Sequence, residues 1–192
     1  MRYPVGKNTE DFKKNWYVAL GFGASQPYGF HEGVDLNLKS GADSDLGEPI
    51  YSIYNYTKEY YHFKSHLESG FGCHYVYKIT GAFGTRWVHC AHNLENPDIQ
   101  NKNSGPENDL LSKVGKTGRP RFILPAHLHF SIFKVDPATL PGGIDNIANT
   151  QEELNRVWED PIAFIEKWMS QPEPPKPPQP SLDTHEKEAL DL

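Results

Sequence analysis

Two pairs of residues in this chain have the types and spacing of zinc ligands. His127 and His129 are two positions apart within Ala-His-Leu-His-Phe, and His31 and Asp35 are four apart within His-Glu-Gly-Val-Asp. On a β-strand, side chains at positions i, i+2 and i+4 point to the same face. Catalytic zinc sites usually combine three protein ligands with one open position for water. The sequence therefore predicts a site in which His31, Asp35 and His129 supply a nitrogen, an oxygen and a nitrogen.

Two further histidines are candidates for proton transfer at such a site. His127 lies two residues before the expected ligand His129, and His92 ends an expected strand. Imidazole titrates near neutral pH, so either side chain could act as a general base. His89, three residues before His92, is an alternative, and strand alternation predicts that it faces the opposite side from His92. The same alternation predicts that Cys90 shares a face with His92, and that Glu32 points away from the site as a loop or surface charge.

The elements that must position these residues are mostly strands. Alternating apolar and polar residues, with Gly and Pro between them, predict strands at 31–38, 48–54, 71–79, 86–91, 110–115 and 127–135, with 71–91 forming a hairpin. Residues 39–47, 54–70 and 93–109 are polar and are expected to be loops, two of which, 54–70 and 93–109, would wall a substrate groove. Residues 10–20 are expected to hold a short amphipathic segment. One late helix is predicted from the capping-box pattern at Thr150, with a restart or kink at Asp160-Pro161.

The overall composition predicts one mainly β domain over residues 1–170. Residues 171–180 contain six prolines, so residues 171–192 are expected to be an extended linker and a disordered tail. The net charge is −6 and no basic run occurs, which argues against a nucleic-acid partner. No apolar run is long enough to span a membrane, and no signal peptide is visible at the N-terminus. Cys73 and Cys90 fall almost opposite one another in the expected hairpin, where two buried thiols are favoured over a disulfide.

These motifs together resemble those of the lysostaphin/LytM-type zinc metallopeptidases. His31-Glu32-Gly33-Val34-Asp35 resembles the family's His-x-Gly-x-Asp motif, and Gly21-Phe22-Gly23 the Gly-Phe-Gly before it. His127 to Phe130 resembles the closing His-Leu-His-Phe, and Cys90 to Asn93 the middle Tyr-Ala-His-Leu. Val114 to Gly118 and Asp160-Pro161 also have counterparts, so the resemblance spans roughly residues 18–165. Cys90 stands where Tyr is usual and Asn93 where Leu is usual, changes that bear on substrate preference more than on metal binding.

The resemblance implies a fold, a cofactor and a reaction. The fold is a compact antiparallel β-sheet or sandwich domain with a loop-walled groove. The ligands of Zn²⁺ are His31, Asp35 and His129, while His92 and His127 form the catalytic pair. The implied function is that of a zinc metalloendopeptidase that hydrolyses peptide bonds in peptidoglycan stem peptides or cross-bridges with a metal-activated water. One of the two histidines would be the general base and the other would stabilise the oxyanion.

Such a protein is expected to act as a monomer outside the cytoplasm, as an extracellular, periplasmic or phage-delivered endolysin-type hydrolase. The alternative is a non-catalytic LytM-like domain that binds cell wall or activates a partner hydrolase. Other zinc enzymes fit less well. Carbonic-anhydrase-like sites need three histidines, and a cupin needs a glutamate soon after His-x-His, where residues 130–135 have none.

Overall fold

The structure is a computed structural model. It describes residues 1–63, 70–95, 97–118 and 125–171, with the side chains of residues 61–63 outside the description. The expected Pro-rich tail lies almost entirely beyond these residues, so the predicted boundary near residue 170 stays a prediction.

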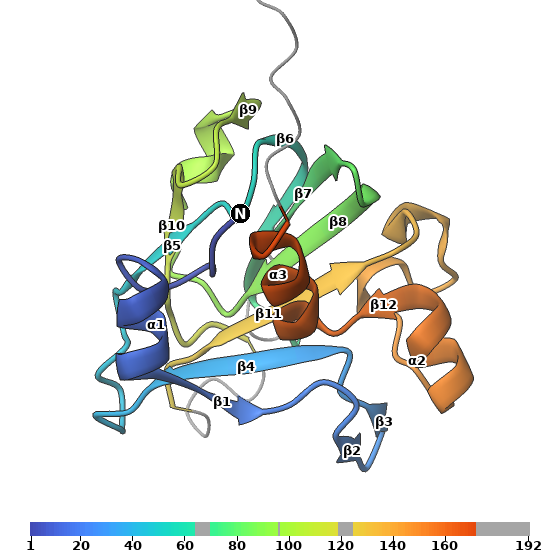
Figure 1. The fold of residues 1–192 in the computed structure, drawn as a ribbon. Helices are drawn as coiled ribbons and strands as arrows, with labels where there is room; N and C mark the ends of the chain where they lie inside the picture. Colours follow the sequence, from blue (N-terminus) through green and yellow to red (C-terminus); the bar gives the residue numbers. More distant parts are fainter. Residues whose placement is uncertain (64–69, 96, 119–124, 172–192) are drawn as a thin grey trace, which may run out of the picture.

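An eight-stranded antiparallel sheet forms the centre of the fold (Figure 1). Its order is β1-β4-β11-β8-β7-β6-β9, and β12 pairs with β11 beyond the part of that strand that β4 covers. The strands are β1 (Trp16–Leu20), β4 (Gly33–Leu38), β6 (Tyr56–Phe63), β7 (Cys73–Gly81), β8 (Gly84–Ala91), β9 (Ser104–Gly105), β11 (Leu128–Phe133) and β12 (Trp158–Glu159). Two small two-stranded sheets accompany it, formed by β5 (Pro49–Tyr51) with β10 (Leu110–Lys113) and by β2 (Ser25–Gln26) with β3 (Gly29–Phe30). The predicted mainly antiparallel β architecture is therefore confirmed.

The predicted hairpin is present as β7 and β8. The pairing continues to Gly81 opposite Gly84, so only Ala82 and Phe83 form the loop. Gly84 has a positive φ of 80°, a conformation that tight hairpin turns demand and that glycine adopts without strain. The two strands next to the site are thus joined by the shortest common connection.

The segment 54–70 was expected to be a loop, and this prediction is wrong for its first part. Residues 56–63 form β6, which pairs with β7 on one side and with β9 on the other. A register shift between Lys58 and Tyr60 interrupts the simple alternation of the strand, which hides it in the sequence. Residues 64–69 lie outside the described residues. The loop 93–109 also contains short elements, the 3₁₀ helix η1 (Asp98–Asn101) and β9.

The described residues contain three α-helices rather than a single late one. The expected amphipathic segment at 10–20 divides into α1 (Thr9–Asn15), capped by Asn8, and β1. The predicted late helix is two helices, α2 (Gln151–Val157) and α3 (Pro161–Met169), with β12 between them. Thr150 caps α2, as its capping-box pattern predicted, and Asp160 caps α3. The predicted restart or kink at Asp160-Pro161 is a break between two helices. Two further 3₁₀ turns, η2 (Pro137–Thr139) and η3 (Gly143–Asp145), precede α2. None of the helices in the described part of the chain is long and apolar enough to cross a membrane.

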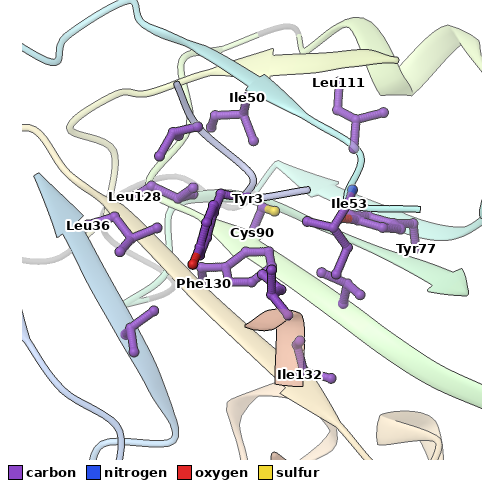
Figure 2. Close-up of a cluster of buried hydrophobic side chains, with 14 of the residues drawn as sticks. Tyr3, Leu36, Ile50, Ile53, Tyr77, Cys90, Leu111, Leu128, Phe130 and Ile132 are labelled. Carbon is purple, nitrogen blue, oxygen red and sulfur yellow. The ribbon is translucent and has the colours of Figure 1, made fainter. Parts of the chain in front are cut away.

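The main hydrophobic core lies on one face of the sheet (Figure 2). Alternate residues of β4 and β11, among them Leu36, Leu128 and Phe130, project into it together with Ile50 of β5 and Tyr3 of the N-terminal segment. The helix α3 also packs there through Phe164 and Ile165. The intervening residues of β4 and β11 must therefore point to the opposite face, and these are the residues with metal-ligand chemistry.

Candidate metal centre

The register of the three middle strands brings the predicted ligands together. In the antiparallel pairing of β11 with β4, His129 lies directly opposite Asp35, and on its other side His129 lies opposite Ala91 of β8. Directly opposed residues in an antiparallel sheet share a face, with Cβ atoms about 4.5–5.5 Å apart. His31 precedes β4 and approaches the same face. Residues almost a hundred positions apart in the sequence thus meet because one strand pair is in register.

The donor atoms of His31, Asp35 and His129 form a nearly equilateral triangle. His31 Nε2 lies 3.1 Å from His129 Nδ1 and 3.2 Å from Asp35 Oδ1, and His129 Nδ1 lies 3.1 Å from Asp35 Oδ1. Ligand atoms about 2.0–2.2 Å from a tetrahedral zinc ion lie roughly 3.3–3.6 Å from one another. The triangle therefore has about the size of one face of a zinc tetrahedron. The set of two imidazoles and one carboxylate fits Zn²⁺, with a fourth position left for water.

His31 is fixed by the segment that the sequence marked as Gly-Phe-Gly. Its Nδ1 lies 3.1 Å from the carbonyl oxygen of Gly21, and its backbone N–H donates to Ala24 O. A carbonyl oxygen can only accept, so Nδ1 carries a hydrogen, and in the neutral ring Nε2 presents a lone pair to the triangle. Metal-binding histidines commonly have such a partner, which sets the tautomer and the ring orientation.

Gly33 explains the spacing within His-x-Gly-x-Asp. It lies opposite Ser131 in the register, directly against the imidazole of His129. A Cβ at this position would lie 2.6 Å from Phe130 O, 2.9 Å from Ser131 Cβ and 3.1 Å from His129 Cε1. Only glycine lets β4 and the His129 ring approach this closely, and that approach closes the triangle.

The charges at the triangle depend on one another. Burial alone would raise the pKa of Asp35, but hydrogen bonds from His129 and His31 outweigh it and hold this pKa far below its usual range. Burial alone would lower the pKa of His31, but the hydrogen bond and the charge of Asp35 outweigh it and raise this pKa above 6.5. Asp35 is therefore an anion, and its charge favours a positive charge on the His31 imidazole. A divalent cation bound at the triangle would replace that imidazole proton as the positive charge beside Asp35.

His92 and His127 lie side by side next to the triangle. Their ring centroids are 4.5 Å apart, and the His92 ring lies 6.2 Å from that of His129. His127 Nδ1 lies 2.9 Å from Pro125 O and His92 Nδ1 lies 2.8 Å from Thr117 O. Each Nδ1 therefore carries a hydrogen, and each Nε2 is left as the nitrogen that can exchange a proton with a bound molecule. Burial, with repulsion from His127 and His129, lowers the pKa of His92 to about 3, so this ring is neutral at neutral pH.

His89 and Cys90 do not lie where strand alternation placed them relative to His92. Alternation stops at Ala91, because His92 has a left-handed backbone with φ of 62°. His89 and His92 consequently face the same side, where the rings of both contact Phe71 and His129. Cys90 points into the core on the other face, which corrects the expectation that it shares a face with His92.

The buried position of His89 separates it from the two proton-transfer candidates. Its Nε2 lies 3.1 Å from His74 Nδ1, its Nδ1 lies 3.4 Å from Ser131 Oγ, and burial lowers its pKa well below 6.5. Both ring nitrogens thus face protein groups, whereas His92 and His127 each keep one nitrogen for another partner. Cys73 and Cys90 are both buried thiols, in agreement with the favoured prediction.

Glu32 was expected to be a loop or surface charge, and it is buried with only 5% of its surface exposed. Burial raises its pKa, and the neighbouring His129 and His31 partly offset this rise. The residue lies just before the start of β4, so strand alternation does not determine its environment.

The loop 39–47 and Asn37 of β4 make contacts near His127 that the sequence does not predict. Asp43 accepts a hydrogen bond from Ala126 N at 2.8 Å, and Asn37 donates to Ala126 O at 2.8 Å. Asn37 Nδ2 also approaches Asp45 Oδ2 at 3.3 Å, and Lys116 pairs with Asp43. Both peptide groups of Ala126 are thereby held, which fixes the chain next to His127. Only the Asp content of this loop distinguishes it in the sequence, and the spacing gives no indication of the partner.

The fold matches those of known peptidases. The chain aligns with the catalytic domain of the antimicrobial peptidase lysostaphin from Staphylococcus simulans with a TM-score of 0.53, at 16% identity, over 83% of this chain and 98% of that domain. It aligns with lysostaphin as a whole with a TM-score of 0.54, at 15% identity, over 95% of this chain and 61% of that one. A zinc-containing peptidase from Vibrio cholerae aligns with a TM-score of 0.49, at 20% identity, over 68% of this chain and 35% of that one.

The chain thus spans nearly all of an isolated catalytic domain, but only about a third to three fifths of the longer proteins. No protein-family model and no curated protein sequence matches the chain. The structural likeness shows that the chain has a LytM-type peptidase fold.

Proposed function

We propose that this chain is a zinc metalloendopeptidase that hydrolyses peptide bonds in peptidoglycan stem peptides or cross-bridges. The observation that supports it is the triangle of His31 Nε2, Asp35 Oδ1 and His129 Nδ1, with edges of 3.1–3.2 Å, beside two more histidines. The LytM-type fold favours a peptidase, and the motif resemblance favours a cell-wall peptide as substrate. Such a substrate lies outside the cytoplasmic membrane, so we expect the chain to act there, as a monomer.

The proposed ligands fit the requirements of the metal. His31 and His129 would bind through the nitrogens that face Asp35, and the carboxylate would offset part of the cation's charge. When bound, zinc lowers the pKa of a coordinated water to about 7 and polarises a substrate carbonyl. Gly21 O and the close contact of Gly33 keep the two imidazoles oriented whether or not the metal is present.

His92 and His127 would carry out the proton transfers. In each ring the Nδ1 hydrogen is donated to a backbone carbonyl, which leaves Nε2 as the reactive nitrogen. An unprotonated Nε2 can accept a proton from the attacking water, and a protonated one can donate a hydrogen bond to the oxyanion. The ring centroids are 4.5 Å apart. The two side chains are therefore close enough for one to accept the proton of the attacking water while the other hydrogen-bonds the oxygen of the same scissile carbonyl. The neutral state of the His92 ring at rest suits a base that must first accept a proton.

Clearing of purified peptidoglycan, followed by turbidity, tests this proposal. The wild-type chain should clear the walls, while His127→Ala and His92→Ala should each reduce the rate by about 100-fold or more and retain their zinc. Glu10→Gln, which changes an exposed charge on α1, is the control and should behave as wild type. A zinc-loaded wild type that leaves walls intact would refute the proposed substrate, and wall binding without cleavage would favour a non-catalytic binding domain.

A further inference from the structure

The backbone of His92 is held in a conformation that is unusual for its residue type. Its φ of 62° is left-handed, which is uncommon outside glycine and costs of the order of 1 kcal/mol or more. This turn directs the His92 ring to the face that carries His127 and His129, whereas regular strand alternation would direct it to the core face with Cys90. Some neighbouring group must therefore compensate for the strain, because an unsupported chain would relax to an extended conformation.

Asn93 is the residue that makes most of the supporting contacts. Its side chain is fully buried, and Nδ2 donates to both Cys73 O and Cys90 O at 2.9 Å. Its Oδ1 accepts from Ser112 Oγ at 2.8 Å, and Ser112 Oγ lies 3.1 Å from Tyr75 OH. The amide thus links β7, β8 and β10 at the point where the chain leaves β8. Every polar atom of the side chain has a partner, as expected of a buried polar group that specifies one conformation.

The main chain of Asn93 extends this network to His92 through Thr117. Asn93 N donates to Cys73 O at 2.9 Å, and Asn93 O accepts from Thr117 Oγ1 at 2.8 Å. Thr117 Oγ1 in turn accepts from Cys73 N, while Thr117 O accepts from His92 Nδ1, both at 2.8 Å. Asn93 and Thr117 together therefore fix the backbone turn at His92 and the tautomer of its ring.

The contact between the Thr117 loop and His92 leaves no free space. A Cβ on Gly118 would lie 2.9 Å from His92 Nδ1 and 2.2 Å from Gly70 O, and Gly118 has a φ of 115°. Glycine is thus required where the loop passes the ring. The hydrogen bonds of Thr117 Oγ1 with Asn93 O and Cys73 N help to hold the loop at this distance.

We propose that Asn93 is a positioning residue for His92, which holds the left-handed turn and, through Thr117, the Nδ1–H tautomer, so that Nε2 faces the reaction site. This rests on the proposed function only for its catalytic consequence, because the geometry of the ring can be measured separately. The leucine usual at this position in the resembled family could fill the volume but could not donate to Cys73 O and Cys90 O.

The test combines ring ¹⁵N NMR on the histidine-labelled full chain with wall clearing, in wild type and Asn93→Leu. The expected result is an Nδ1–H tautomer for His92 in the wild type. In the variant, the ring and Cα signals of His92 should shift, and clearing should fall about 10- to 100-fold, the order of loss expected from misplacing a catalytic group by about 1 Å. Asn93→Asp has almost the same shape, but a carboxyl carries at most one hydrogen and cannot donate to both Cys73 O and Cys90 O, so it should also shift the His92 signals; it replaces the Leu variant if that does not fold.

Tyr56→Phe is the matched control, because it removes a buried hydroxyl that donates to Asp109 and makes no contact with His92. His92 signals that stay at their wild-type positions in both Asn93 variants would overturn the positioning role, whatever happens to clearing. Shifted His92 signals in the Asn93 variants but not in Tyr56→Phe would support it. If even the wild type clears no walls, the proposed function fails, and the NMR comparison still decides whether Asn93 positions the ring.

Discussion

The substitution Gly33→Ala should disrupt the metal centre through the spacing of two strands. A methyl group at residue 33 would lie 2.6 Å from Phe130 O, a backbone atom that cannot rotate away. A methyl carbon in ordinary contact lies at least about 3.5 Å from another heavy atom, so β4 and β11 would have to separate by roughly 0.9 Å. The distance between Asp35 Oδ1 and His129 Nδ1, now 3.1 Å, would increase by a similar amount. Zinc sites tolerate only about 0.2 Å in their bond lengths.

Two effects of different size follow from this separation. Overpacking of a buried strand contact costs about 1–3 kcal/mol in the free energy of unfolding, and the backbone contact places this site near the upper end. Zinc affinity should fall by about 10- to 100-fold or more, the range found when residues that orient the ligands are changed. Urea unfolding of the metal-free chain measures the first effect, and competition with a coloured zinc chelator measures the second.

Gly21→Ala is the matched control for this experiment. A Cβ on Gly21 meets nothing within 4 Å, and the carbonyl that accepts from His31 is retained. This variant should unfold and bind zinc as the wild type does. If Gly33→Ala also kept wild-type zinc affinity and lost less than about 0.5 kcal/mol of stability, the close approach of β4 to His129 would not be what forms the site.

Three further predictions follow from the buried groups. The His92 pKa of about 3 lies below the ordinary 6.5, so the unfolded chain binds a proton that the folded chain does not as the pH falls from 6.5 to 3. The metal-free protein should therefore lose about 3–5 kcal/mol of stability over that window, and urea titrations should show a smaller loss in His92→Gln. Because Asp35 raises the pKa of His31 and a zinc ligand must be unprotonated, zinc binding near pH 6.5 should release a proton; calorimetry in buffers of different ionisation enthalpy should detect it, and equal heats in all buffers would contradict it. Cys73 and Cys90 are fully buried and burial raises the Cys90 pKa to about 12, so a thiol reagent should label both only after unfolding; rapid labelling of the folded chain would show that the core is open.

The sequence predicts which residues meet at the candidate metal centre because their common face depends on strand periodicity. Residues two and four apart share a face, and the pairs at 127 and 129 and at 31 and 35 each flank or occupy a strand with a clear apolar alternation. The antiparallel partner of each strand is not readable from that pattern. The pairing of β4 with β11 is a finding of the structure, and its register places Asp35 opposite His129.

The wrong predictions concern residues at which the alternation of side chains along a strand is interrupted. The left-handed turn at His92 reverses the expected faces of His89 and Cys90 relative to His92. The hydrogen bonds of Asn93 and Thr117 that hold this turn join residues far apart in the sequence, so local spacing does not reveal it. A register shift conceals β6 among polar and aromatic residues. The burial of Glu32 depends on its position just before a strand rather than within one. In each case tertiary contacts, which local spacing does not encode, determine the conformation.

The most direct test of this account is the zinc content of the purified chain and of His129→Ala, measured by elemental analysis after dialysis against metal-free buffer. We expect about one zinc per wild-type chain and almost none in the variant, because removing one corner of the triangle leaves only His31 and Asp35. His127→Ala should keep its zinc and so separates ligand from neighbour. A wild-type chain without zinc, or a His129→Ala variant that retains it, would contradict the assignment of His31, Asp35 and His129 as the metal ligands.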